Sequence, residues 1–198
     1  MTSTEILDVG CGPSPRGTVN IDLNPKFKPT VVAEATWLPF NSSVFDGVYL
    51  SHLLEHVINP ERILREAHRV LKKGRRVTIV FPNFASFNVL MAWIFYFHIR
   101  GKGGSNSPSF ISNGFKRAYN IVFGSHTVGE YDVHHIPLTL PIMRCLLESG
   151  GFRIASISGD VVYLPFRRFR FIRAISRALA RILPSRADII TIVAKKIY

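Results

Sequence analysis

The feature that most constrains the fold lies at the start of the chain, where residues 5–12 read EILDVGCG. A short apolar run that ends in Gly-x-Gly is typical of a buried parallel strand followed by a tight turn. Gly10 and Gly12 carry no side chain that would keep a ligand away from the backbone. The run therefore predicts either a ligand site at the carboxyl end of the first strand or a purely structural turn.

Two acidic residues favour the ligand site. Asp8 lies inside the apolar run, two positions before Gly10. Because a lone buried carboxylate is costly, we expect it to accept hydrogen bonds from N–H groups of the glycine turn or to face a cationic ligand through water. Asp22 lies at the end of a second apolar run, VNIDL, where a carboxylate can accept both hydroxyls of a ribose. Together the two runs indicate a ligand of nucleotide type.

Short apolar runs alternate with helical stretches along the chain, which is the pattern of an α/β fold with a parallel sheet and crossover helices. The clearest helix begins at Asn59-Pro60 and ends at 72–74, and a second is expected from Leu140-Pro141 to Gly150-Gly151. The residues expected on the buried face of the first helix are Ile63, Leu64, Ala67, Val70 and Leu71. Strands are predicted near 5–10, 18–23, 30–34, 46–51, 76–81, 152–158 and 188–195.

The length of 198 residues suits one domain, so residues 1–198 are expected to form a single one. The alternation lapses over 84–135, and we interpret that segment as a lid or insertion. Its aromatic run is shorter than the ~20 apolar residues of a membrane span.

Two distant cysteines make neither a disulfide framework nor a zinc site, so no metal is expected. Because no secretion signal begins the chain, we expect a cytoplasmic protein.

Positive charge is concentrated in the later part of the chain. The formal net charge is +12, yet residues 1–66 hold only five Lys/Arg against eight Asp/Glu. On a helical wheel, residues 165–186 place their arginines opposite a set of apolar residues. Such a basic amphipathic helix suits an anionic membrane surface, but it is equally consistent with a helix that covers the sheet, and RNA is a less favoured partner. The clustered arginines are Arg167, Arg170, Arg173, Arg177 and Arg181.

Further motifs follow the glycine turn in a fixed order. LDVGCG, then Asp22, then Glu34-Ala35 before LPF, resemble the cofactor motifs of class I S-adenosylmethionine-dependent methyltransferases. FDGVYLSHLLEHV resembles the fourth strand of that family and the loop after it. REAHRVLKKGRRVTIVFPN is similar to the next helix and fifth strand, and LTLPIMRCLLESGGFRI to the helix before the sixth strand.

The resemblance implies a Rossmann-like three-layer sandwich with a seven-stranded, mostly parallel sheet. Its antiparallel last strand would be IITIVAKK, inserted beside the fifth strand. The implied cofactor is S-adenosylmethionine. The implied cofactor-binding residues are Asp8, Gly10, Cys11 and Gly12 at the methionine portion, Asp22 and Leu23 at the ribose, Glu34 and Ala35 at the adenine, and Ser51 and His52 on the far side of the cofactor.

Two departures from related folds bear on this interpretation. Only residues 11–18 separate the first two strands, whereas a parallel crossover usually takes a dozen or more residues. We therefore expect the first crossover helix to be missing, as in truncated members of the family. The fingerprint of dinucleotide-dependent oxidoreductases has a third glycine, and Pro15 stands at that place here, which favours S-adenosylmethionine over a dinucleotide.

Histidines are the candidate catalytic residues, because a histidine is the default base for taking a proton from an attacking hydroxyl or amine near neutral pH. His134 and His135 precede the second helix, where related enzymes close over their substrate, and His52 is the rival beside the cofactor. Each also fits a structural, hydrogen-bonding role. We predict a methyltransferase that acts on a small or lipid-linked acceptor, peripheral on the inner face of a membrane; the alternative is a non-catalytic membrane- or RNA-binding protein with the same fold.

Overall fold

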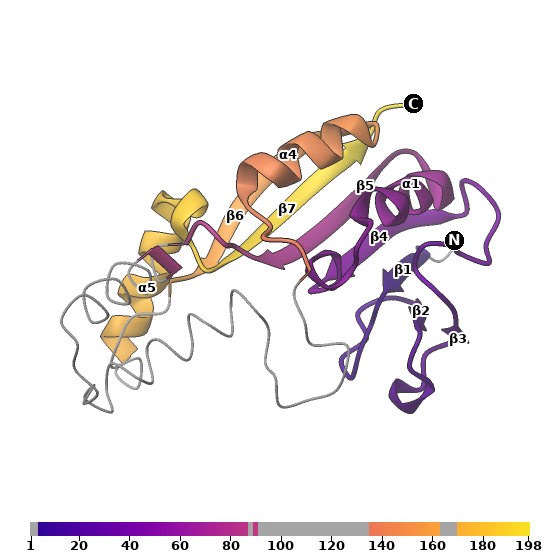
Figure 1. The fold of residues 1–198 in the computed structure, drawn as a ribbon, viewed down its shortest axis with the longest axis horizontal. Coiled ribbons are helices and arrows are strands. Elements are labelled where there is room, and N and C mark those ends of the chain that lie inside the picture. The colour runs from indigo at the N-terminus through magenta and orange to yellow at the C-terminus, as the bar shows by residue number, and fades with distance from the viewer. Residues whose placement is uncertain (1–3, 87–88, 91–134, 163–169) are drawn as a thin grey trace. The chain divides into compact units, whose positions relative to one another are not determined.

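The computed structural model describes residues 4–86, 89–90, 135–162 and 170–198 (Figure 1). The strands are β1 (Ile6–Val9), β2 (Val19–Asp22), β3 (Val31–Val32), β4 (Phe45–Ser51), β5 (Leu71–Pro82), β6 (Phe152–Val161) and β7 (Ile189–Lys196). The helices are α1 (Pro60–Val70), α4 (Leu140–Ser149) and α5 (Arg170–Ile182), with short 3-10 turns η1 (Pro25–Phe27), η2 (Leu54–His56) and η3 (Pro184–Arg186).

The strands form one seven-stranded sheet in the order β3-β2-β1-β4-β5-β7-β6. Strands β1 to β5 pair in parallel, with Val9 opposite both Ile21 of β2 and Leu50 of β4. Strand β7 lies between β5 and β6 and runs against them (Figure 1). The predicted Rossmann-like α/β fold, with its antiparallel last strand beside the fifth, is therefore confirmed.

Helix α1 begins where the sequence predicts it. The Asn59 side chain accepts a hydrogen bond from the Arg62 N–H, and Pro60 occupies the first turn. The predicted inward face is buried in the structure. Its members, each at most 1% exposed, are Ile63, Leu64, Ala67, Val70 and Leu71.

The boundary between α1 and β5 differs from the prediction, because the helix ends at Val70 and the strand begins at once. Strand β5 pairs with β4 at Leu71 and again at Arg76, and the bulge between them lies in the segment expected to end the helix. Lys72 of the bulge forms an ion pair of 3.0 Å with Asp46. From β7, Lys196 donates to the carbonyl oxygens of His68 (2.6 Å) and Leu71 (2.8 Å), which closes the helix end.

The connection between β1 and β2 holds no helix, as the spacing predicts. It turns back directly along the edge of β1, where the Thr18 hydroxyl accepts from the Ile6 N–H (2.9 Å) and lies 3.2 Å from the Ile6 carbonyl oxygen. A Cβ at Gly17 would lie 2.6 Å from that carbonyl oxygen and 2.7 Å from the Asp8 nitrogen. Only glycine fits there, because the connection lies against the strand backbone.

The chain divides into two compact units. The first comprises 1–81, 141–157 and 191–198, and contains the core residues Leu7, Val9 and Leu50, all fully buried. The second comprises 82–140 and 158–190. In the second unit the buried Asn83 amide donates to the carbonyl oxygens of Ser185 and Ala187, each at 2.9 Å. Within the described ranges, no helix is long and apolar enough to cross a membrane.

Candidate functional site

The glycine turn follows β1 at the carboxyl end of the parallel strands. Gly10 and Gly12 have φ values of 68° and 54°, which favour glycine over any other residue. A Cβ at Gly10 would lie 2.9 Å from the Leu53 side chain, so packing also restricts this position. A Cβ at Gly12 would meet no atom within 4 Å. The turn therefore leaves open space above Gly12.

The end of β2 holds this turn in place. The N–H groups of Gly10 and Cys11 both donate to the Ile21 carbonyl oxygen, at 2.9 and 3.0 Å. The Asp22 carboxylate accepts from the Gly12 N–H at 2.9 Å and from the Asn24 N–H at 2.8 Å. Each oxygen of Asp22 has one such donor and, as a carboxylate, can accept a second. The structure thus brings the glycines and the predicted ribose-binding acid together.

Asp8 is buried in β1, at 1% exposure, as the sequence predicts. Its Oδ2 accepts a hydrogen bond from the Arg16 N–H at 2.7 Å. The donor therefore follows the glycine turn in the sequence, whereas the sequence analysis expected a donor within the turn. Its Oδ1 is buried and has no hydrogen-bond partner among the described residues. Burial raises the pKa of Asp8, and the negative charge of Asp22 adds to the effect. Beside the turn, the buried Oδ1 of Asp8 thus has no hydrogen-bond donor among the described residues.

The loop after β4 supplies the opposite wall, because β1 and β4 are neighbours in the sheet. Ser51 ends β4, and His52 follows it in the left-handed region, with φ 51°. Such a φ is uncommon for a residue other than glycine. The His52 side chain is 47% exposed, and its Nδ1 lies 3.4 Å from Oε1 of Glu55.

Glu55 is a residue that the sequence analysis missed. It is 1% exposed, and neither carboxylate oxygen has a hydrogen-bond partner among the residues described. Besides His52, the Nε2 of His56 lies 3.9 Å from its Oε1. An acid inside the apolar run YLSHLLEHV was the available signal, since a buried carboxylate needs a charged or hydrogen-bonding neighbour.

The LPF run, which follows the residues predicted to lie at the adenine, is hydrogen-bonded to α1. Glu66 accepts from the Leu38 N–H at 2.7 Å, and Arg69 donates to the Phe40 carbonyl oxygen at 2.6 Å. The hydrogen bond from Arg69 lowers the pKa of Glu66, which keeps this ion pair charged. Preceding this fastened stretch, Glu34 is exposed and accepts from the Thr36 hydroxyl.

The remaining predicted residues lie as follows. Cys11 is 7% exposed, and burial raises the pKa of its thiol. Leu23 is 54% exposed, and Ala35 is half-buried. His134 lies outside the described residues, and His135 is exposed in the second unit, whereas the glycine turn belongs to the first. In the part of the chain that the structure describes, no group of His, Cys, Asp and Glu could hold a metal ion.

Comparison with known proteins points to this same region. Residues 7–79 match a family model described as a methyltransferase domain. The matched stretch runs from β1 into β5 and contains the glycine turn, Asp22 and the loop after β4.

Two curated relatives are similar over parts of this region. The chain is 35% identical over 75 residues to the mitochondrial 2-methoxy-6-polyprenyl-1,4-benzoquinol methylase of Caenorhabditis elegans, covering 38% of this chain and 25% of that protein. It is 43% identical over 51 residues to the demethylmenaquinone methyltransferase of Mycobacterium bovis, covering 26% and 22%. The chain thus spans about a quarter of the length of these relatives.

Solved structures match over the whole chain. A SAM-dependent methyltransferase from Methanosarcina mazei has a TM-score of 0.59 at 20% identity, covering 100% of this chain and 94% of that one. One from Archaeoglobus fulgidus has a TM-score of 0.56 at 18% identity, covering 98% and 87%. A cyclase also matches, with a TM-score of 0.55 at 16% identity, covering 100% and 76%. At these identities the likeness establishes the fold.

The Asp8→Asn variant tests the electrostatics of the turn. Burial raises the pKa of Asp8, so ionising it costs stability in the folded chain, and the wild type regains that stability as the pH falls through the folded pKa. We expect the variant to be more stable than the wild type at neutral pH. The difference should shrink as the pH falls toward the ordinary aspartate value of 3.8. Urea denaturation followed by circular dichroism across this range measures it.

Asp46→Asn is the matched control with the opposite sign. The hydrogen bond from Lys72 lowers the pKa of Asp46, so its ionised form stabilises the fold above the ordinary value and that stability is lost as the pH falls. This variant should be less stable than the wild type at neutral pH. A less stable Asp8→Asn variant at neutral pH would contradict the interpretation of Asp8.

Proposed function

We propose that this chain, in which residues 7–79 are a methyltransferase domain of the class I type, binds S-adenosylmethionine and transfers its methyl group to a small or lipid-linked acceptor. The observation that carries the proposal is the open space at Gly12, whose N–H donates to the Asp22 carboxylate, together with the buried Oδ1 of Asp8, which has no partner among the described residues. The domain and the fold imply the cofactor. The methyl acceptor is inferred from the relatives and from the surface of the second unit.

The residues of the turn fit a cationic cofactor with a ribose. The unpartnered Oδ1 of Asp8 can accept a hydrogen bond, directly or through water, from a positively charged amino group. Asp22 keeps a free acceptor position on each carboxylate oxygen for the two ribose hydroxyls. Gly10 and Gly12 would hold the methionine portion of the cofactor, and Glu34 and Ala35 would hold its adenine.

S-Adenosylmethionine supplies a sulfonium methyl group that an acceptor attacks in line, so the protein's part is orientation, exclusion of water and proton removal. His52 is the candidate base at the wall formed by the loop after β4. Its left-handed φ fixes the backbone there, and its side chain is half-exposed. Its Nδ1 lies 3.4 Å from Oε1 of the buried Glu55, which can orient the imidazole. His134 and His135 remain rival candidates.

Two observations support a hydrophobic acceptor. The C. elegans relative is named for a polyprenyl benzoquinol and the M. bovis relative for demethylmenaquinone. We infer that this chain methylates a quinol-like or other lipid-linked ring. Such an acceptor partitions into membranes, so the enzyme that methylates it gains by binding a membrane surface.

Helix α5 has the features of a membrane-surface helix. Its inward side is narrow, with Ser176 and Ala180 buried and the Ser176 hydroxyl bonded to the Val162 carbonyl oxygen. Its arginines at 170, 173, 177 and 181 are exposed and favour an anionic surface. Three of the apolar residues on the side away from the arginines are also exposed: Ile175 (49%), Leu179 (38%) and Ile182 (72%). Phe171, which flanks the arginines, is 64% exposed. This exposure disfavours a helix that merely covers the sheet.

The alternative function is a non-catalytic membrane- or RNA-binding protein that keeps the methyltransferase fold. The same arginines support it. The two functions differ in cofactor binding, since a surface-binding protein has no need of the open space above Gly12.

Calorimetric titration with S-adenosylmethionine tests the proposed function. The wild type should bind, and Asp22→Ala should bind about 10- to 100-fold more weakly, because hydrogen bonds to a charged group are lost. Glu61→Ala, an exposed acid on α1, is the matched control and should bind as the wild type does. No heat from a folded wild type at about millimolar ligand would exclude the enzyme and leave the surface-binding alternative.

Turnover of a short-chain quinol tests the candidate base. A positioned general base contributes about 10²- to 10⁴-fold, so His52→Ala should lose at least tenfold in turnover while keeping its affinity for S-adenosylmethionine. His134→Ala and His135→Ala are measured beside it under the same conditions. A loss confined to one of those two variants would move the base to the second unit.

Flotation with vesicles of phosphatidylglycerol and phosphatidylcholine tests the membrane surface. The full chain should float at low salt, and Phe171→Ser/Ile175→Ser should not. Arg173→Gln/Arg177→Gln should partition about 30-fold more weakly, given about 1 kcal/mol for each arginine at an anionic surface. Arg62→Gln/Arg65→Gln, on the exposed face of α1, is the control for net charge. Failure of the full chain to float would contradict the proposal.

A further inference from the structure

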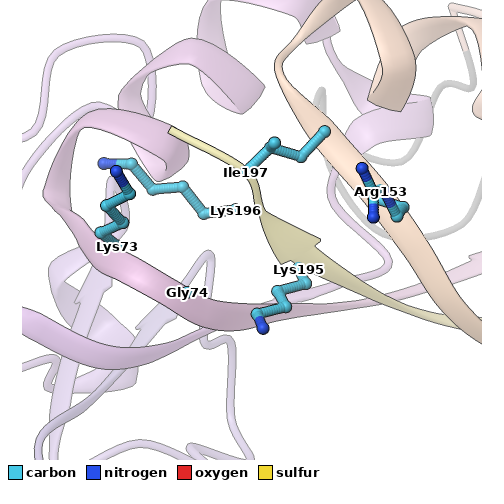
Figure 2. Close-up of a pocket in the computed structure, with 6 residues that line it drawn as sticks. All are labelled: Lys73, Gly74, Arg153, Lys195, Lys196 and Ile197. Carbon is cyan, nitrogen blue, oxygen red and sulfur yellow. The ribbon is translucent and has the colours of Figure 1, made fainter.

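A second candidate site lies in the first unit, at the amino ends of the parallel strands β5 and β6 and the carboxyl end of β7. The glycine turn lies at the opposite edge of the sheet, after the carboxyl end of β1. The site is a pocket of about 260 Å³ (Figure 2). Its lining residues come from three neighbouring strands and the residue after β7: Lys73, Gly74, Arg153, Lys195, Lys196 and Ile197.

The pocket has four cationic side chains and no acidic one in its lining. The bulge that begins β5 explains why the charge is not neutralised there. Lys72 and Arg75 both pair with Asp46 at 3.0 Å, whereas Lys73 lines the pocket instead. Among the residues described, no carboxylate lies within 4.0 Å of the charged nitrogens of Lys73, Arg153 or Lys195.

Part of the pocket is rigid. Lys196 is only 7% exposed, and its Nζ is fixed by the carbonyl oxygens of His68 and Leu71 at the end of α1. Lys196 thus fixes the end of β7 beside the pocket, whereas the exposed Lys195 lies on the opposite face of the strand. Gly74 has φ 75°, and a Cβ there would lie 3.6 Å from the Lys195 side chain, so the bulge backbone lies against that lysine.

We propose that this pocket binds a phosphate group, as a soluble phosphate ester or as the headgroup of an anionic phospholipid. Like charges at Lys73, Arg153 and Lys195 repel one another, and a dianion that contacts two of them reduces that repulsion. Arg153 offers the forked donor geometry that matches phosphate, and the lysines offer point charges. The volume is below the roughly 300–1,000 Å³ of pockets for drug-sized ligands, which suits a phosphate group better than a whole nucleotide.

Pyrophosphate is the soluble probe, titrated calorimetrically into the full chain without S-adenosylmethionine. The wild type should bind, more weakly as salt rises, and Arg153→Gln/Lys195→Gln should bind at least about tenfold more weakly, because charge-assisted hydrogen bonds are lost. Arg62→Gln/Arg65→Gln removes the same charge from the exposed surface of α1 and should bind nearly as the wild type does. An equal loss of pyrophosphate affinity in both double variants would overturn the proposal, since the net positive charge of the chain would then explain the binding.

Vesicles of phosphatidic acid and phosphatidylcholine separate the two sources of phosphate. The measurement uses the Phe171→Ser/Ile175→Ser background, so that α5 does not dominate binding. Vesicle binding that needs Arg153 and Lys195, without pyrophosphate binding, identifies the lipid headgroup; pyrophosphate binding alone identifies a soluble ester. Binding of neither probe overturns the proposal. Because the pyrophosphate and vesicle assays need no cofactor, their outcome is independent of the proposed methyl transfer.

Discussion

The glycine turn depends on its hydrogen bonds to the end of β2. In folds of this kind a crossover helix usually follows such a turn, but here residues 10–18 form no helix. The N–H groups of Gly10, Cys11 and Gly12 are instead held by the Ile21 carbonyl oxygen and the Asp22 carboxylate. Asp22 therefore holds the glycine turn in place and, on the proposed function, would also bind the ribose. One side chain would then serve both roles.

The sequence predicted the sheet because each strand is a short apolar run bounded by turn residues. Both the spacing of apolar residues and the turn residues can be identified within a few positions of the chain. It also predicted the buried Asp8 and the shortened crossover. The end of α1 was placed wrongly because a contact from the far end of the chain, Lys196 to the His68 carbonyl oxygen, closes the helix there. Glu55 was missed because an acid inside an apolar run does not by itself identify its partner; the structure supplies that partner, His52, whose backbone is left-handed.

The fold by itself leaves the reaction open, since a cyclase shares it with the methyltransferases. The matched domain and the side chains around the turn support methyl transfer. The names of the two curated relatives and α5, whose apolar residues are exposed beside its arginines, support a lipid-linked acceptor. The glycine turn and α5 belong to different units, so the proposal for the cofactor and the proposal for the membrane surface can fail independently.

Charge is distributed along the chain in a way that suits the proposed chemistry. Asp8 and Asp22, the acids beside the glycine turn, suit a cationic ligand when ionised. S-Adenosylmethionine carries a sulfonium charge that its product lacks, so on the proposed function these acids would bind the substrate form of the cofactor more strongly than the product form. The positive charge that gives the chain its +12 lies after residue 66, and part of it is on α5 and around the pocket at the start of β5. On the proposals above, the acidic region of the chain would bind the cationic cofactor and the basic region would bind anionic partners.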